Sequence, residues 1–205
     1  MFSHTDFIDN FSKRIPDMPA AFHDSQTKAV YIDKGDFHRL RIYEHMLHEI
    51  IHTAAFHKFH ADVKNRMIKN YRTGYGFKDP RTNGHEIFYR FNEAVVDKTT
   101  YEILRKHADE LMQKLSITPE EIKVSQFIYN PFVNILDKII QRIADKKGES
   151  ETAVWQKLER GQFTGEMMHL RDIEKYIGKG LLKKLANIKF MEDAESDLPP
   201  EIINE

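Results

Sequence analysis

The sequence predicts a mostly helical α+β protein, and three patterns carry this prediction. Apolar residues recur at helical spacing over 37–59, 92–115 and 130–147. Two short segments are β-prone instead: one at 28–33, before the first helical segment, and one within 70–91, between the first and the second. We therefore expect long helices combined with a small sheet or hairpin.

The first of these elements is the run KAVYID at 28–33. Val30 and Ile32 alternate with Tyr31, which is the period of a β-strand. The next segment, 37–59, repeats apolar residues every three to four positions and contains neither proline nor glycine. This pattern predicts one long helix.

Residues 70–91 follow with aromatic side chains at alternate positions, such as Tyr75 and Phe77. The pairs Asp79–Pro80 and Asn83–Gly84 are turn signals, so we expect a hairpin or paired extended loop. The apolar spacing then returns and predicts a helix over 92–115.

The last third of the chain is predicted to be helical. The run TPEE at 118–121 and the run NPF at 130 both place proline at a first helical position. Shorter helices, separated by glycines, are expected around 150–160, 170–177 and 179–188. The final segment, 191–205, contains six acidic and no basic side chains, and we expect it to be a disordered tail.

Composition limits the class of protein. The chain has 205 residues, of which 40% are hydrophobic and 31% charged, as in ordinary globular proteins. We expect a single domain over 1–190, followed by the acidic tail at 191–205. The net charge of −1 predicts no nucleic-acid partner. No secretion signal and no apolar run of about 20 residues is visible, so we expect a cytoplasmic protein without a membrane partner.

The motif HEIIH at 48–52 lies in the first predicted helix. Side chains four residues apart face the same way, about 6 Å from each other, so His48 and His52 can share one metal ion. Glu49 is turned by about 100° from His48 and can act as a general base beside the ion. Because the chain has no cysteine, any metal must be held by His, Asp or Glu. The motif therefore predicts a Zn²⁺ site.

A catalytic zinc ion needs a third protein ligand. The best candidate is Glu93, which begins the helix predicted after the hairpin. Asp97 follows one helical turn later and could accept the second N–H of a ligand histidine. Glu86 and His85 are reserve candidates for the third ligand.

Together, HEIIH at 48–52 and NEAVVD at 92–97 resemble the gluzincin clan of zinc metallopeptidases. The resemblance implies a zincin-like fold with a metal-site core at 30–115 and a helical part at 116–190. It also implies His48, His52 and Glu93 as zinc ligands, Glu49 as general base, and Asn92 and Asp97 as hydrogen-bond partners of the ligand histidines. By the same resemblance, the strand at 28–33 would hold an extended substrate backbone beside the zinc.

Another zinc peptidase pattern is excluded by position. A metzincin would have glycine at position 55 and histidine at position 58, where this chain has Ala55 and Lys58. The spacing from His52 to Glu93 is longer than in compact gluzincins, and a hairpin inserted at 70–91 accounts for the difference.

Peptide hydrolysis also needs a donor that stabilises the tetrahedral oxyanion. The candidates are Tyr129 first, then Tyr75 and His169. Three further histidines are expected to be pocket-edge or surface residues rather than ligands: His45, and His57 and His60 at the end of the first helix.

We therefore expect a zinc metallopeptidase that hydrolyses peptide bonds through a zinc-bound water activated by Glu49, with a peptide or protein as substrate. The alternative is a catalytically inactive or autoinhibited zinc-binding regulatory or interaction module of zincin fold. A helical scaffold without metal is the third interpretation.

Overall fold

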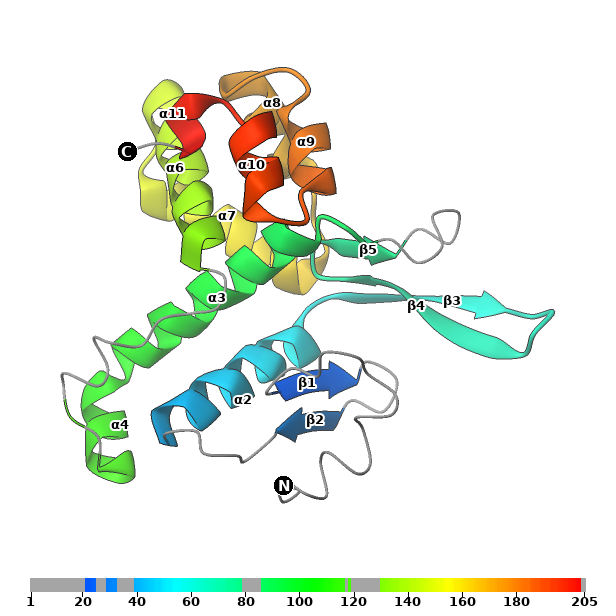
Figure 1. The fold of residues 1–205 in the computed structure, drawn as a ribbon, viewed down its shortest axis with the longest axis vertical. Helices are drawn as coiled ribbons and strands as arrows, with labels where there is room; N and C mark the ends of the chain where they lie inside the picture. Colours follow the sequence, from blue (N-terminus) through cyan, green and yellow to red (C-terminus); the bar gives the residue numbers. More distant parts are fainter. Residues whose placement is uncertain are drawn as a thin grey trace. The chain divides into compact units, whose positions relative to one another are not determined.

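The computed structural model (Figure 1) describes residues 21–24, 29–32, 39–78, 86–116, 118 and 130–203. The chain divides into two compact units, and each is described here by itself. The first unit comprises residues 1–54 and 99–127, and the second comprises residues 55–98 and 128–205.

The first unit combines a small hairpin with helices. Strand β1 (Ala21–Asp24) pairs antiparallel with β2 (Ala29–Ile32), which confirms the strand predicted at 28–33. Helix α2 (Arg39–Ala54) packs on both strands (Figure 1). The second half of α3 (Tyr89–Lys106) and α4 (Ala108–Leu115) complete the described part of this unit. The apolar core contains Leu40, Leu104 and Leu111, with Tyr43, Leu47, Met112 and Leu115 packed against them.

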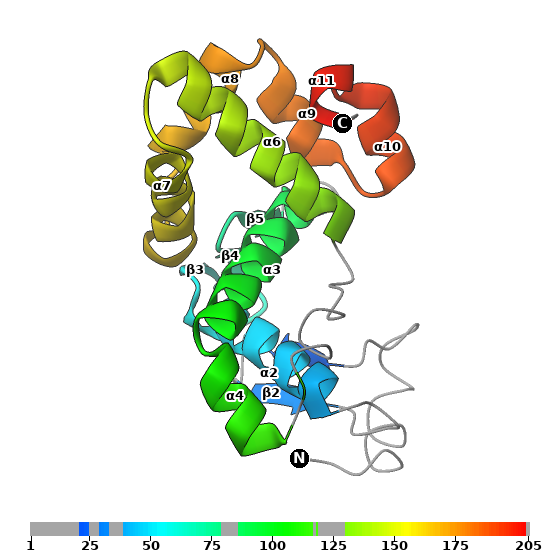
Figure 2. The ribbon, with the colours of Figure 1, turned by 90° about the vertical axis from the view of Figure 1, so that its left-hand side faces the viewer.

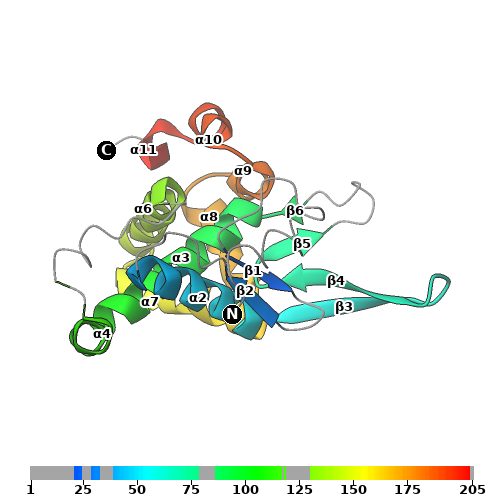
Figure 3. The ribbon, with the colours of Figure 1, turned by 60° about the horizontal axis from the view of Figure 1, so that its bottom comes forward.

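The second unit contains a four-stranded antiparallel sheet with the order β3-β4-β5-β6 (Figure 3). Its strands are β3 (His57–Asp62), β4 (Met67–Thr73), β5 (Gly76–Lys78) and β6 (Glu86–Ile87). The pairing of β5 with β6 agrees with the hairpin predicted within 70–91, whose expected turn lies outside the described residues. β4 pairs with β5 only at its last two residues, so most of β3 and β4 extends as a two-stranded arm, the β3–β4 ribbon.

Helices form the main core of the second unit. They are the first half of α3, α6 (Asn130–Lys147), α7 (Glu151–Thr164), α8 (Arg171–Tyr176), α9 (Leu181–Asn187), α10 (Met191–Asp197) and α11 (Pro200–Ile203). α6 packs against α7, α8 and α11 (Figure 2) and buries an apolar stripe that includes Leu136, Ile139 and Ile143. The chain's single tryptophan, Trp155, is buried in this core.

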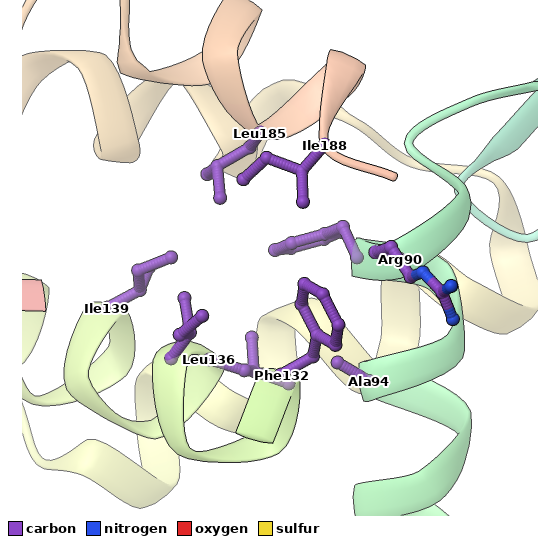
Figure 4. Close-up of a pocket in the computed structure, with 9 residues that line it drawn as sticks. Arg90, Ala94, Phe132, Leu136, Ile139, Leu185 and Ile188 are labelled. Atoms are coloured by element: carbon purple, nitrogen blue, oxygen red, sulfur yellow. The ribbon is translucent and has the colours of Figure 1, made fainter. Parts of the chain in front are cut away.

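A small cavity lies in the same core, among side chains of α3, α6 and α9 (Figure 4). Its volume is about 10 Å³, and its lining is apolar except for Arg90. A space of this size can hardly hold one water molecule, so it is a packing gap rather than a ligand site.

The base of the ribbon is joined to α7 through one backbone hydrogen bond and one buried arginine. Phe56 donates its N–H to the carbonyl of Gln162 over 2.9 Å. Arg72 is only 7% exposed and donates to the carbonyls of Gly74 at 2.6 Å and Gly165 at 3.0 Å. Its guanidinium also lies 5.0 Å from the ring centroids of Phe56 and of Phe77. Arg72 therefore connects β4 to the C-terminal end of α7.

Two sequence predictions of secondary structure are wrong. The helix expected over 37–59 ends at Ala54, and the following residues form β3 because they pair with β4. The prediction missed β4, which follows β3 after a four-residue turn, because the first residues of β3 also fit the helical spacing. His57 and His60, expected at a helix end, therefore lie in β3.

The C-terminal segment is also ordered where a disordered tail was expected. Residues of α10 and α11 fold back onto the second unit and bury Ala194, Leu198 and Ile202. These apolar residues recur every four positions among the acidic ones, so the helices bury one face and expose the carboxylates. The acidic composition hid this amphipathic pattern.

Candidate metal-binding residues

His48 and His52 lie one helical turn apart on α2, within the first unit. Their Nε2 atoms are 3.0 Å apart, and the ring centroids are separated by 4.7 Å. Two nitrogens bound to one tetrahedral zinc ion, each at about 2.0–2.1 Å, would be about 3.3 Å apart. The two imidazoles thus converge closely enough to share one ion. They are also close enough for a single N–H···N hydrogen bond.

Glu49 follows His48 on the same helix and is half-buried. Its backbone carbonyl accepts a hydrogen bond from the Thr53 hydroxyl over 2.9 Å, which is a regular contact inside a helix. This bond uses the main-chain carbonyl of Glu49 and does not involve its carboxylate. The helical position of Glu49 is the one expected for a general base beside the two imidazoles.

Asn92, Glu93 and Asp97 lie in the first half of α3, within the second unit. All three side chains are buried, with exposed fractions of 2%, 6% and 2%. Asn92 accepts the backbone N–H of Tyr75 on its amide oxygen over 2.8 Å and so holds the β4–β5 turn against α3. Buried carboxylates such as Glu93 and Asp97 are costly unless cations or hydrogen-bond donors compensate their charge.

Two candidate oxyanion donors, Tyr75 and His169, are in contact with each other inside the second unit. The Tyr75 hydroxyl donates to the carbonyl of Leu158 over 2.7 Å, and the His169 Nε2 lies 2.5 Å from the Tyr75 hydroxyl oxygen. His169 must therefore donate through Nε2, because the hydroxyl proton is already used. Burial raises the pKa of Tyr75 and lowers that of His169, so both groups are neutral at pH 7. The hydrogen bond between Tyr75 and His169 is therefore a structural contact. Tyr129, the first candidate for the oxyanion donor, lies outside the described residues.

The remaining candidates have other surroundings. Burial, with Arg41 nearby, lowers the pKa of His45 to about 4, so this imidazole is neutral at pH 7. Glu86 is half-buried in β6, and His85 lies outside the described residues. His57 contacts the Thr73 hydroxyl on β4 through Nδ1, at 3.3 Å.

The first unit supplies His48 and His52 as possible metal ligands, and the second unit supplies Glu93. No protein-family model, curated protein or solved structure matches the chain. None of the described helices has the length and apolar character needed to cross a membrane. The two sequence motifs and the contacts above are therefore the basis for any functional assignment.

Sequence reasoning missed two features of the second unit. The buried Arg72 looked like one of many cationic residues, and only its contacts reveal its role. The β3–β4 ribbon was missed because the predicted helix at 37–59 overlapped the start of β3, and the predicted hairpin at 70–91 began inside β4. Its signal was the polar turn at Asp62–Arg66 between two stretches that can pair.

Proposed function

We propose that the chain is a zinc-dependent peptidase whose metal ligands are His48, His52 and Glu93. The observation that carries this proposal lies within the first unit: the Nε2 atoms of His48 and His52 are 3.0 Å apart, close enough to bind one ion. Two imidazoles and one carboxylate are a known ligand set of catalytic zinc and leave a coordination position open. Glu93, the third proposed ligand, is buried in the second unit with an exposed fraction of 6%.

The roles of the side chains follow from this arrangement. A bound zinc ion would lower the pKa of a water molecule, so that this water could lose a proton at neutral pH and attack a peptide carbonyl. Glu49 would accept the proton of the attacking water and pass it to the leaving amine. Asp97 would accept the second N–H of a ligand imidazole and fix its orientation.

Zinc binding is the first test. We expect about one zinc ion per chain by elemental analysis of the purified protein, as the ligand set implies. Glu93→Gln should weaken zinc affinity by at least about tenfold, because the amide carries no charge. Glu110→Gln, which changes an exposed carboxylate of α4, is the matched control and should bind zinc normally. Equal zinc affinity in Glu93→Gln and wild type would refute the ligand set.

Turnover is the second test. Wild type and Glu49→Gln are compared on a mixed peptide library, each with its zinc content measured. We expect cleavage by wild type and a loss of about 100-fold or more in Glu49→Gln, with zinc retained. Equal cleavage by both proteins would remove Glu49 from the mechanism.

A catalytically inactive zinc-binding module is the second candidate function. The observation that favours it is the contact between Tyr75 and His169, which occupies two candidate oxyanion donors in the interior. Under this alternative, wild type binds one zinc ion and cleaves no peptide of the library. Turnover that depends on Glu49 would exclude it.

A further inference from the structure

The far end of the β3–β4 ribbon is a well-defined turn, formed by Val63, Lys64, Asn65 and Arg66 between the two strands (Figure 1). Asp62 organises this turn. Its carboxylate accepts the backbone N–H of Asn65 at 3.1 Å and the side-chain amide of Asn65 at 2.9 Å. The chain then reverses at Arg66, which has a φ of +52°. We call the segment from Asp62 to Lys69 the ribbon tip.

The ribbon tip is cationic, although the whole chain has a net charge of −1. Lys64, Arg66 and Lys69 lie within eight residues that contain a single acid, Asp62. That acid is already paired, because Lys69 binds its carboxylate at 3.2 Å. Lys64 and Arg66 are exposed and have no acidic partner among the residues that the structure describes. The tip therefore presents uncompensated positive charge.

The ribbon tip is also apolar, and its apolar side chains point in several directions. Val63, Met67 and Ile68 are 85%, 50% and 64% exposed. Met67 pairs with Asp62 and Ile68 pairs with Ala61, and successive residues of a strand face opposite sides. Met67 and Ile68 therefore lie on opposite faces of the ribbon, while Val63 lies in the turn. A partner that covers one face would leave at least one of these side chains in water.

We propose that the ribbon tip inserts into the headgroup region of an anionic lipid bilayer. A bilayer surrounds an inserted tip on all sides, so it can cover Val63, Met67 and Ile68 at the same time. Its acidic headgroups complement Lys64 and Arg66. A folded protein partner fits less well, because it would cover one face of the ribbon tip and leave the apolar side chain on the other face in water. This proposal does not depend on the zinc site.

The test measures binding of the full chain to lipid vesicles by flotation. One set of vesicles is a phosphatidylcholine–phosphatidylserine mixture, and the other is phosphatidylcholine alone. We expect binding to the anionic vesicles only, and a clear decrease as salt is raised. Lys64→Gln with Arg66→Gln should weaken binding about 25-fold, since each cation contributes about fivefold near an anionic surface. Val63→Ser with Ile68→Ser should weaken it by about tenfold or more.

Matched controls come from the same unit. Lys179→Gln with Lys183→Gln removes two exposed cations elsewhere, and Met168→Ser removes an exposed apolar side chain. Both controls should bind the anionic vesicles as wild type does. The fluorescence of Trp155 during urea unfolding checks that every variant remains folded.

Three results would overturn the proposal. The first is no binding to anionic vesicles, or equal binding to both kinds of vesicle. The second is an equal loss of binding in the lysine control and in the tip variant. The third is tighter binding to double-stranded DNA than to the vesicles, which would make the tip a nucleic-acid contact instead.

Discussion

Gly161 lies inside α7, where two physical effects of a Gly161→Ala substitution oppose each other. Alanine in a helix interior is favoured over glycine by about 1 kcal/mol. However, a Cβ at this position would collide with the Tyr75 hydroxyl and the His169 ring, and it would lie 2.7 Å from the Glu166 carbonyl. Overpacking of a well-packed site typically costs about 1–3 kcal/mol. Three collisions at once place Gly161 at the upper end of that range.

We therefore expect Gly161→Ala to destabilise the second unit by about 2 kcal/mol, the balance of about 3 kcal/mol of overpacking and about 1 kcal/mol of helix propensity. The assay is urea unfolding followed by the fluorescence of Trp155, which reports on this unit. With a slope of about 2 kcal/mol/M, the midpoint should fall by about 1 M.

Two further variants sharpen the test of Gly161. Gly178→Ala is the control, because a Cβ there would meet no atom within 4 Å, and its midpoint should change little. Combining Gly161→Ala with Tyr75→Phe removes one colliding atom, so the double variant should lose less stability than the two single losses added together. A midpoint for Gly161→Ala at or above that of wild type would refute the packing argument.

Three other predictions concern the second unit. Burial lowers the pKa of His169 in the folded state, so as the pH falls the unfolded state takes up a proton before the folded state does, and stability should decrease below about pH 6.5. In urea unfolding at a series of pH values, His169→Gln should flatten this decrease. Ile139→Ala, at a fully buried site of α6, should cost about 3 kcal/mol by Trp155 fluorescence, and a loss below about 1 kcal/mol would contradict the packing. The Asp193 carboxylate accepts the backbone N–H of Phe190 at the start of α10, so Asp193→Ala should speed proteolysis of the C-terminal segment, and unchanged cleavage would exclude a capping role.

Much of the helical architecture could be predicted from the sequence. The helix at 130–147 begins with a proline at its second residue and keeps one apolar stripe, and α6 has those bounds. The glycines at 161 and 165 suggested a helix end near 160, whereas α7 continues to Thr164. Gly161 lies inside the helix, where neighbouring atoms leave no room for a Cβ, and it does not mark a turn. Gly165, at a φ of +78°, ends that helix.

The candidate site was predictable only as far as one helix determines it. The approach of His48 to His52 follows from their spacing on α2. The burial of Glu93 and Asp97 was not visible in the sequence, because it depends on which face of α3 the rest of the chain covers. The contact between Tyr75 and His169 joins residues far apart in the sequence, and no local pattern could reveal it.

Arg72 has a further consequence for how this protein responds to its solution. In the described part of the chain its hydrogen-bond acceptors are carbonyl groups and its other neighbours are aromatic rings, with no carboxylate that acid could neutralise. Mobile ions also screen a buried group of this kind weakly. The base of the β3–β4 ribbon should therefore stay attached to α7 at high salt concentration and in mild acid. Any salt response of the ribbon tip can then be traced to the tip alone.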